Sequence, residues 1–271
     1  MRDISSIKKL PPEAASDLRS EPIRVNQAYE LTWSAVYVFL KRNQKFVAVK
    51  GPKDFFTPEE LQKLAPFEVF FTPKRSTEID YYQEKGRLLR RYLESVWDVE
   101  QKLASDPDPK EEPPASFEVS ANTMEKICEV WGTKRTLMNW EIVAYIDSVC
   151  RGVPGELWLR LREISIQQFD EILYRSSWVL FFALHLGYTD IDFLNRYRTE
   201  LFKRALGDSA EDLISPELDE VEKLVNTWLG KTPEGLSSSE IMENWDSRVA
   251  QKISFRLDQV NKYEEARKHG S

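Results

Sequence analysis

The chain has 271 residues, which is enough for one large domain or two ordinary ones with buried cores. Its eight Trp, ten Tyr and fourteen Phe predict packed cores rather than disorder. The net charge of -7 argues against nucleic-acid binding by phosphate neutralisation, because such binding needs a clustered basic surface. No apolar run is long enough to span a bilayer, and residues 1–10 carry no apolar signal core, so we expect a cytoplasmic location and no membrane span.

An N-terminal arm precedes the first patterned stretch. Residues 1–22 carry three prolines among mixed charges, which predicts a flexible arm. Residues 36–40 and 46–49 are apolar runs separated by a polar turn of hairpin length. Their two-residue alternation predicts a β-hairpin that is buried on both faces, and residues 23–31 could add one more strand.

A short helix and a further strand complete this stretch. Thr57 is a good N-cap, Pro58 suits the first helical position, and Glu60 suits a capping box. Residues 68–72 return to a strand pattern, and residues 77–104 carry apolar side chains every three to four positions, which predicts a long helix. We therefore expect a small α+β module with a long exit helix over residues 23–104.

The clearest predicted domain boundary is the segment 105–116, SDPDPKEEPPAS. It has little apolar surface to bury and its prolines oppose a helix, so we expect an extended linker. Residues 117–271 show helical spacing and no strand pattern, which predicts an all-helical bundle. The predicted fold class is therefore α+β, with a small β-hairpin/α/β module followed by helices.

The most apolar segment, residues 166–186, has the length of a central core helix. Gly187 follows it and is a natural C-terminal cap. Capping signals open further helices at Thr189 with Asp192, at Ser215–Glu217, and at Ser237 with Glu240.

The chain lacks the residues of common reaction centres. Its only histidines are His185, on an apolar helix, and His269, near the end of the chain, so a multi-histidine metal site cannot form. No glycine-rich phosphate loop, GxSxG or HExxH motif occurs. Cys128 and Cys150 fall at helical apolar positions and are read as buried reduced thiols. We expect no cofactor, although an all-carboxylate metal site remains an alternative.

The span VYVFLKRNQKFVAVKGPKDFFTPEELQKLAPFEVFFTPK, followed by the helix with Tyr81 and Tyr82, resembles the small N-terminal domain of bacterial HD-GYP cyclic-di-GMP phosphodiesterases. The resemblance covers about 60 residues and implies a diverged HD-type helical domain after the module. The chain departs from that family where its His-Asp pair should stand, since residues 201–208 read LFKRALGD, and the GYP segment has no counterpart. The resemblance therefore implies a non-catalytic regulatory relative.

One basic and aromatic cluster is a candidate binding site. Tyr81, Tyr82, Arg87, Arg90 and Arg91 fall within about three turns of one predicted helix. The spacing of Arg87 and Arg91 fits the RxxxR pattern of some cyclic-di-GMP binding domains, and the guanidinium fork suits phosphate. The other interpretation is a solvated, salt-bridged helix face.

Trp158, in the segment ELWLRLRE, is the tryptophan that we expect to make an exposed partner contact. Together with the missing reaction centres, these features predict a non-enzymatic, cytoplasmic bacterial signalling or scaffold protein that binds a protein partner. A cyclic-di-GMP-binding effector is the second hypothesis, and an enzyme with a carboxylate-metal site is the third.

Overall fold

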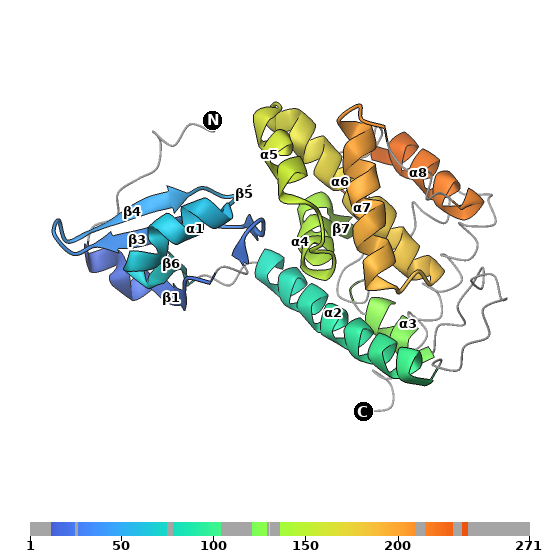
Figure 1. The fold of residues 1–271 in the computed structure, drawn as a ribbon, viewed down its shortest axis with the longest axis horizontal. Coiled ribbons are helices and arrows are strands. Elements are labelled where there is room, and N and C mark those ends of the chain that lie inside the picture. The colour runs from blue at the N-terminus through green and yellow to red at the C-terminus, as the bar shows by residue number, and fades with distance from the viewer. Residues whose placement is uncertain are drawn as a thin grey trace. The chain divides into compact units, whose positions relative to one another are not determined.

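A computed structural model of the protein describes residues 12–24, 27–74, 78–103, 121–128, 130, 136–209, 215–229 and 235–237. The chain divides into two compact units, the first combining residues 1–81 with 158–163 and the second combining 82–157 with 164–271. A sheet dominates the first unit and helices dominate the second, which confirms the predicted α+β class (Figure 1).

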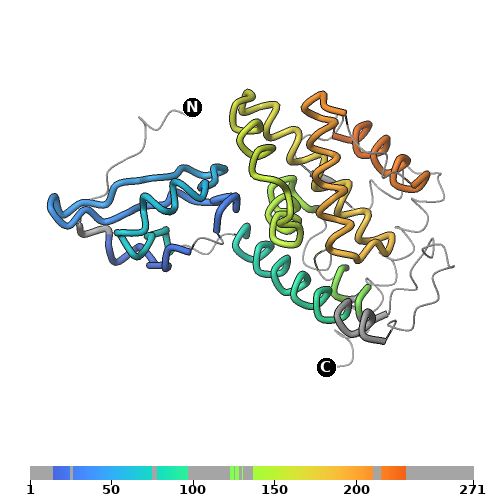
Figure 2. The backbone as a smooth tube through the Cα atoms, in the orientation of Figure 1, coloured from blue at the N-terminus to red at the C-terminus, as the bar shows by residue number. Residues whose placement is uncertain are grey.

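The main sheet of the first unit has four antiparallel strands in the order β1-β6-β3-β4. These strands are β1 (Leu18–Pro22), β6 (Val69–Pro73), β3 (Val36–Leu40) and β4 (Lys45–Lys50). The last two form the predicted hairpin, which lies in the blue part of the tube in Figure 2. Two shorter strands, β2 (Leu31–Thr32) and β5 (Asp54–Phe55), pair with each other.

Both faces of the sheet are packed, as the alternation in β3 predicts. Val36 and Val38 join a core cluster on one face that includes Leu61 of α1 (Pro58–Leu64). Tyr37 lies in a second cluster, whose other buried members are Leu18, Phe46 and Ala48. Because adjacent residues of a strand point to opposite faces, the run VYVFL supplies both clusters.

The start of α1 is fixed by the predicted capping box. The Thr57 hydroxyl accepts a hydrogen bond from the Glu60 N–H at 3.2 Å, and the Glu60 carboxylate accepts one from the Thr57 N–H at 2.8 Å. Pro58 occupies the first turn, where a missing N–H costs nothing.

The predicted boundary of the N-terminal arm needs a correction. Residues 18–22 are not an arm but strand β1, which pairs with β6 along its whole length, and Leu18 is buried. Its polar, proline-ended sequence suits an edge strand, which needs only one hydrogen-bonded neighbour. The partner strand lies about fifty residues later, so no local pattern indicates the pairing.

The second unit is built from helices around one central helix. α6 (Ile166–Leu186) packs against α4, α7 and α8, and its C-terminal half, residues 176–185, is buried. The other helices with residues in this unit are α2 (Glu78–Leu103), α3 (Ala121–Cys128), α4 (Asn139–Val149), α5 (Gly155–Glu163), α7 (Ile191–Ala205) and α8 (Pro216–Leu229) (Figure 1).

Gly86 permits a close approach of two helices within this unit. A Cβ atom placed on Gly86 of α2 would overlap the Tyr145 carbonyl oxygen of α4 and lie 2.8 Å from Ser148 Cβ. Backbone stands on one side of that contact, so a side chain here forces the helices apart. The predicted inward stripe of α2 is confirmed at Tyr82, Leu89 and Leu93, all of which are buried.

Two of the predicted helix ends in this unit are confirmed. α6 ends at Gly187, whose φ of 102° is the left-handed cap that glycine favours. α8 begins after Ser215, whose hydroxyl accepts from the Leu218 N–H at 3.3 Å. The predicted Thr189 cap is wrong by one residue, because the Asp190 carboxylate instead accepts from the Asp192 N–H at 2.8 Å.

The expectation of no strand after the linker is also wrong. β7 (Thr136–Met138) and β8 (Gly235–Ser237) pair antiparallel, joining residues about a hundred positions apart. Both strands are too short to show an alternating pattern.

The predicted linker 105–116 and most of the helix expected after Ser237 lie outside the described residues. The division into compact units falls at residues 81 and 82, within α2, and the linker stays a prediction as a domain boundary.

Candidate functional site

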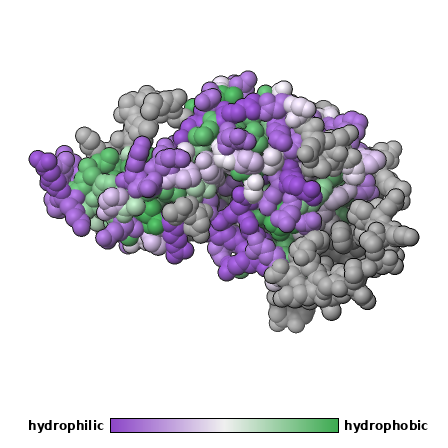
Figure 3. Space-filling view, in the orientation of Figure 1, coloured by the Kyte–Doolittle hydropathy of each residue, from purple (hydrophilic) through white to green (hydrophobic). Residues whose placement is uncertain are grey.

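The outward face of α2 carries the part of the predicted cluster that is accessible. We define this α2 face as Glu84, Arg87, Leu88 and Arg91, all of which are exposed. The Leu88 side chain is 47% exposed, and Tyr81, about two turns earlier on the same helix, is 39% exposed. Figure 3 shows mainly hydrophilic residues over the visible part of this helix.

Both arginines of the α2 face share one carboxylate. Arg87 Nη1 lies 3.7 Å from one Glu84 oxygen, and Arg91 Nη2 lies 3.4 Å from the other. All three side chains are about half exposed or more, so water screens these pairs and each is weak. The guanidinium forks therefore lie at the surface with only loose partners.

The structure does not bring the whole predicted cluster to one surface. Tyr82 is 1% exposed and belongs to the core. Arg90 points sideways on the helix and donates from Nε to Glu94 at 2.7 Å, with a quarter of its side chain exposed. Only Tyr81, Arg87 and Arg91 of the five residues remain on the exposed side of α2.

The prediction that Trp158 makes an exposed partner contact is wrong. Its side chain is 2% exposed, and its ring lies 5.4 Å from that of Phe55. Both residues belong to the first unit, which includes residues 158–163 at the end of α5. The tryptophan is therefore part of a core and is not available to a partner.

Arg162, in the same segment as Trp158, joins a charge cluster with Lys50, Asp54 and Glu60. Its Nη2 donates to the Phe55 carbonyl at 2.5 Å and lies 3.3 Å from Asp54, while its guanidinium stands 4.0 Å from the centre of the Phe55 ring. Lys50, almost fully buried, lies 2.9 Å from Glu60 and 3.6 Å from Asp54. Two cations and two anions balance here, which is the pattern of a structural network.

The charges of this cluster affect the pKa of Glu60. Burial alone raises the pKa of Glu60, but the Thr57 N–H, Lys50 and Arg162 together bring that pKa below its ordinary value of 4.5. Glu60 is therefore held ionised as the acceptor of both the helix cap and the cations.

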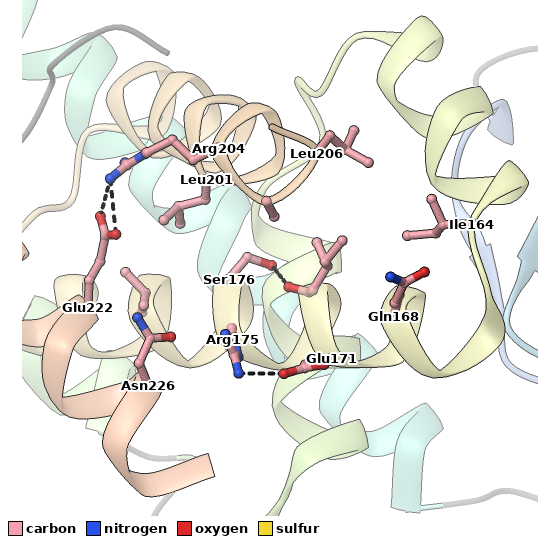
Figure 4. Close-up of a pocket in the computed structure, with 13 residues that line it drawn as sticks. Ile164, Gln168, Glu171, Arg175, Ser176, Leu201, Arg204, Leu206, Glu222 and Asn226 are labelled. Atoms are coloured by element: carbon pink, nitrogen blue, oxygen red, sulfur yellow. Dashed lines mark hydrogen bonds and ion pairs between the residues drawn. The ribbon is translucent and has the colours of Figure 1, made fainter. Parts of the chain in front are cut away.

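A second candidate site is a pocket of about 510 Å³ within the second unit (Figure 4). One stripe of α6, from Gln168 to Val179, forms its length. The end of α7 supplies Leu201 and Arg204, and α8 supplies Glu222 and Asn226. This volume lies within the range of about 300–1,000 Å³ that is usual for small-molecule sites.

One end of the pocket is held by a rigid ion pair. Arg204 Nη1 donates to both oxygens of Glu222, at 2.9 and 3.0 Å, and the Tyr197 hydroxyl donates to Glu222 at 2.8 Å. Burial, and then the negative charge of Glu222, raise the pKa of Tyr197, so that its hydroxyl stays protonated and keeps donating.

The other charged pair of the pocket is exposed. Glu171 and Arg175 stand one turn apart on α6 and form an ion pair, in which the two side chains are 50% and 46% exposed. The rest of the lining mixes aliphatic residues, such as Ile172, Val179 and Leu201, with polar ones, such as Gln168, Ser176 and Asn226. Figure 4 shows the Arg204–Glu222 pair at one side of the pocket and the Glu171–Arg175 pair nearer its middle.

Several ionisable groups of the second unit are paired or buried. Glu171 and Glu222 are each paired with an arginine. His185 is fully buried, with Nδ1 2.7 Å from the Phe181 carbonyl, and burial raises the pKa of the Cys150 thiol to about 12. Within the described ranges, no group of three or more His, Cys, Asp or Glu side chains is placed to hold a metal ion.

Sequence reasoning missed this pocket because its lining comes from separate helices. The stripe Gln168, Glu171 and Arg175 is polar within a mainly apolar helix, and that polar stripe was the one available signal.

No helix in the described part of the chain has the length and hydropathy needed to cross a membrane. No family model, curated protein or solved structure matches this chain.

Proposed function

We propose that this chain is a non-enzymatic signalling or scaffold protein that binds a protein partner through the α2 face. The observation that carries the proposal is the exposure of Leu88 between Arg87 and Arg91. Arginine is among the side chains that dominate binding energy at interfaces, and Leu88 adds exposed apolar surface between the two guanidinium groups.

The charges of the α2 face suit a partner with acidic groups. Glu84 neutralises only one of the two arginines, so the three residues together keep one positive charge. A partner carboxylate can accept hydrogen bonds from a guanidinium fork in two parallel contacts. We therefore expect the partner to present an apolar side chain next to an acidic one.

The first experiment compares partner capture by matched variants. Leu88→Glu places a charge at the centre of the α2 face, and Gln62→Glu adds the same charge on exposed α1. Each variant is used to capture proteins from cells of the source organism, and the captured proteins are compared by quantitative mass spectrometry. The proposal requires one captured protein that is at least tenfold less abundant with Leu88→Glu than with the wild type and equally abundant with Gln62→Glu. The same captured proteins in the same amounts with the wild type and both variants would contradict it.

A second candidate function is recognition of a cyclic dinucleotide by Arg87 and Arg91. The long, exposed ion pairs of Glu84 with both guanidinium groups favour this candidate, because a phosphate could displace the Glu84 carboxylate. Calorimetry with cyclic-di-GMP tests this candidate directly. Heat of binding that disappears in an Arg87→Gln, Arg91→Gln variant supports it, and the absence of heat with the wild type rejects it.

A further inference from the structure

The pocket along α6 has the properties of a site for a small amphipathic acid. Its aliphatic side chains come from three segments, through Ile172 and Val179 of α6, Leu201 of α7, and Leu206 just after α7. Burying a ligand's hydrocarbon against these side chains removes apolar surface from water, which favours binding. The body of the ligand is therefore apolar.

The two arginines of the pocket differ in how readily they can accept a ligand. Arg204 is held by two hydrogen bonds to Glu222, which also receives the Tyr197 hydroxyl, and the Glu222 side chain is only 19% exposed. Breaking that pair would leave a largely buried carboxylate with one partner fewer, which is costly. Arg204 and Glu222 therefore stay paired, although Arg204 Nη2 is buried without a hydrogen-bond partner in the described part of the chain.

Arg175 is the arginine whose partner can be replaced. Its pair with Glu171 is about half exposed and lies on a single helix, so water screens the attraction and the pair is weak. If Glu171 turns into solvent, it keeps its hydration, and Arg175 can then receive another anion. The Glu171 carboxylate marks where that anion would sit.

The geometry points to a binding site for a small organic monocarboxylate with an apolar body, whose carboxylate pairs with Arg175 while its hydrocarbon occupies the space beside Val179 and Leu201. A carboxylate is favoured over a phosphate because the two carboxylates of the lining already balance its two arginines. A monoanion adds one negative charge at Arg175, whereas a dianion adds two beside Glu171. This site is distinct from the α2 face and would make the protein responsive to a metabolite.

Isothermal titration with decanoate, decanamide and decyltrimethylammonium tests the site. These probes share a hydrocarbon chain and differ in charge. We expect decanoate to bind the wild-type chain at least about tenfold more tightly than either other probe, since only decanoate can form charge-assisted hydrogen bonds with Arg175. Equal affinities, preference for the cation, or no binding of decanoate each overturn the inference.

Three variants locate the binding. Arg175→Gln should weaken decanoate about tenfold and leave decanamide unchanged, while Glu171→Gln should strengthen decanoate about twofold because it removes the competing anion. Ala205→Trp, at an exposed lining position, should block both probes. Arg42→Gln, on the exposed hairpin turn, is the charge-matched control. Equal weakening by Arg42→Gln and Arg175→Gln, or a loss of decanoate affinity in Glu171→Gln, refutes the assignment.

Discussion

Replacing Arg162 with alanine should weaken the first unit more than any other single change of an exposed or half-exposed cation. The guanidinium donates to the Phe55 carbonyl at 2.5 Å and lies 4.0 Å from that residue's ring centre. A charge-assisted hydrogen bond contributes about 1.5–3 kcal/mol. A cation over an aromatic ring contributes about 0.5–2 kcal/mol, depending on its exposure.

The other contacts of Arg162 change the expected loss in the free energy of unfolding only modestly. Its ion pairs with Asp54 and Glu60 lie at 3.3 and 3.6 Å and are partly open to solvent, so each adds less than about 1 kcal/mol. Its Nε is buried without a hydrogen-bond partner in the described part of the chain, which offsets some of the gain. Because these contributions share one side chain they do not add fully, and we expect a loss of about 2–4 kcal/mol.

Urea unfolding of the full chain, followed by tryptophan fluorescence, measures this loss. Trp158 packs against Phe55 and so reports on the same cluster. Arg91→Ala is the control, because Arg91 is 65% exposed and its pair with Glu84 is loose, so its loss should cost less than about 1 kcal/mol. If Arg162→Ala unfolds at the same urea concentration as Arg91→Ala, the cluster does not stabilise the first unit.

Three further predictions concern stability. Lys50→Met should destabilise the first unit by about 3–5 kcal/mol in urea unfolding, since it leaves Glu60 short of a buried cation. The pKa of Glu60 in the folded chain is below 4.5, so the ionised carboxylate stabilises the fold fully above pH 4.5 and loses this effect as the pH falls through the folded pKa. Glu60→Gln should therefore flatten the dependence of the free energy of unfolding on pH below pH 4.5. Gly86→Ala should cost at least about 2 kcal/mol because of the overlap with α4, whereas Gly51→Ala, with open space around it, should be close to neutral.

Each of these predictions has a contradicting result. A Lys50→Met protein as stable as the wild type would mean that the buried charges contribute no net attraction. A Glu60→Gln protein that loses stability in acid as steeply as the wild type would place the sensitive carboxylate elsewhere. Equal unfolding midpoints for Gly86→Ala and Gly51→Ala would show that α2 and α4 can separate without cost.

Local features were predictable from the sequence because their causes lie within a few residues. The hairpin follows from the alternation in residues 36–40, the start of α1 follows from the Thr57 capping box, and the end of α6 follows from Gly187. Each of these is fixed by neighbours in the chain, so the tertiary context could not override them.

Features that depend on distant segments were missed. β1 and β7 are recognisable only through partners far away in the chain, and both are short. Trp158 was expected at the surface because nothing near it in sequence indicates Phe55 as its neighbour. The α6 pocket likewise depends on how the end of α7 and α8 approach one stripe of α6. The resemblance to HD-GYP-associated domains, and the signalling role drawn from it, stay predictions.

The most direct test of the proposed function is site-specific photo-crosslinking in cells of the source organism. A photoreactive amino acid is placed at position 88, at the centre of the α2 face, or at position 62 on exposed α1. We expect position 88 to give one discrete adduct with a single protein that position 62 does not give. No adduct at position 88, or the same adducts at both positions, would contradict the claim that the α2 face binds a partner.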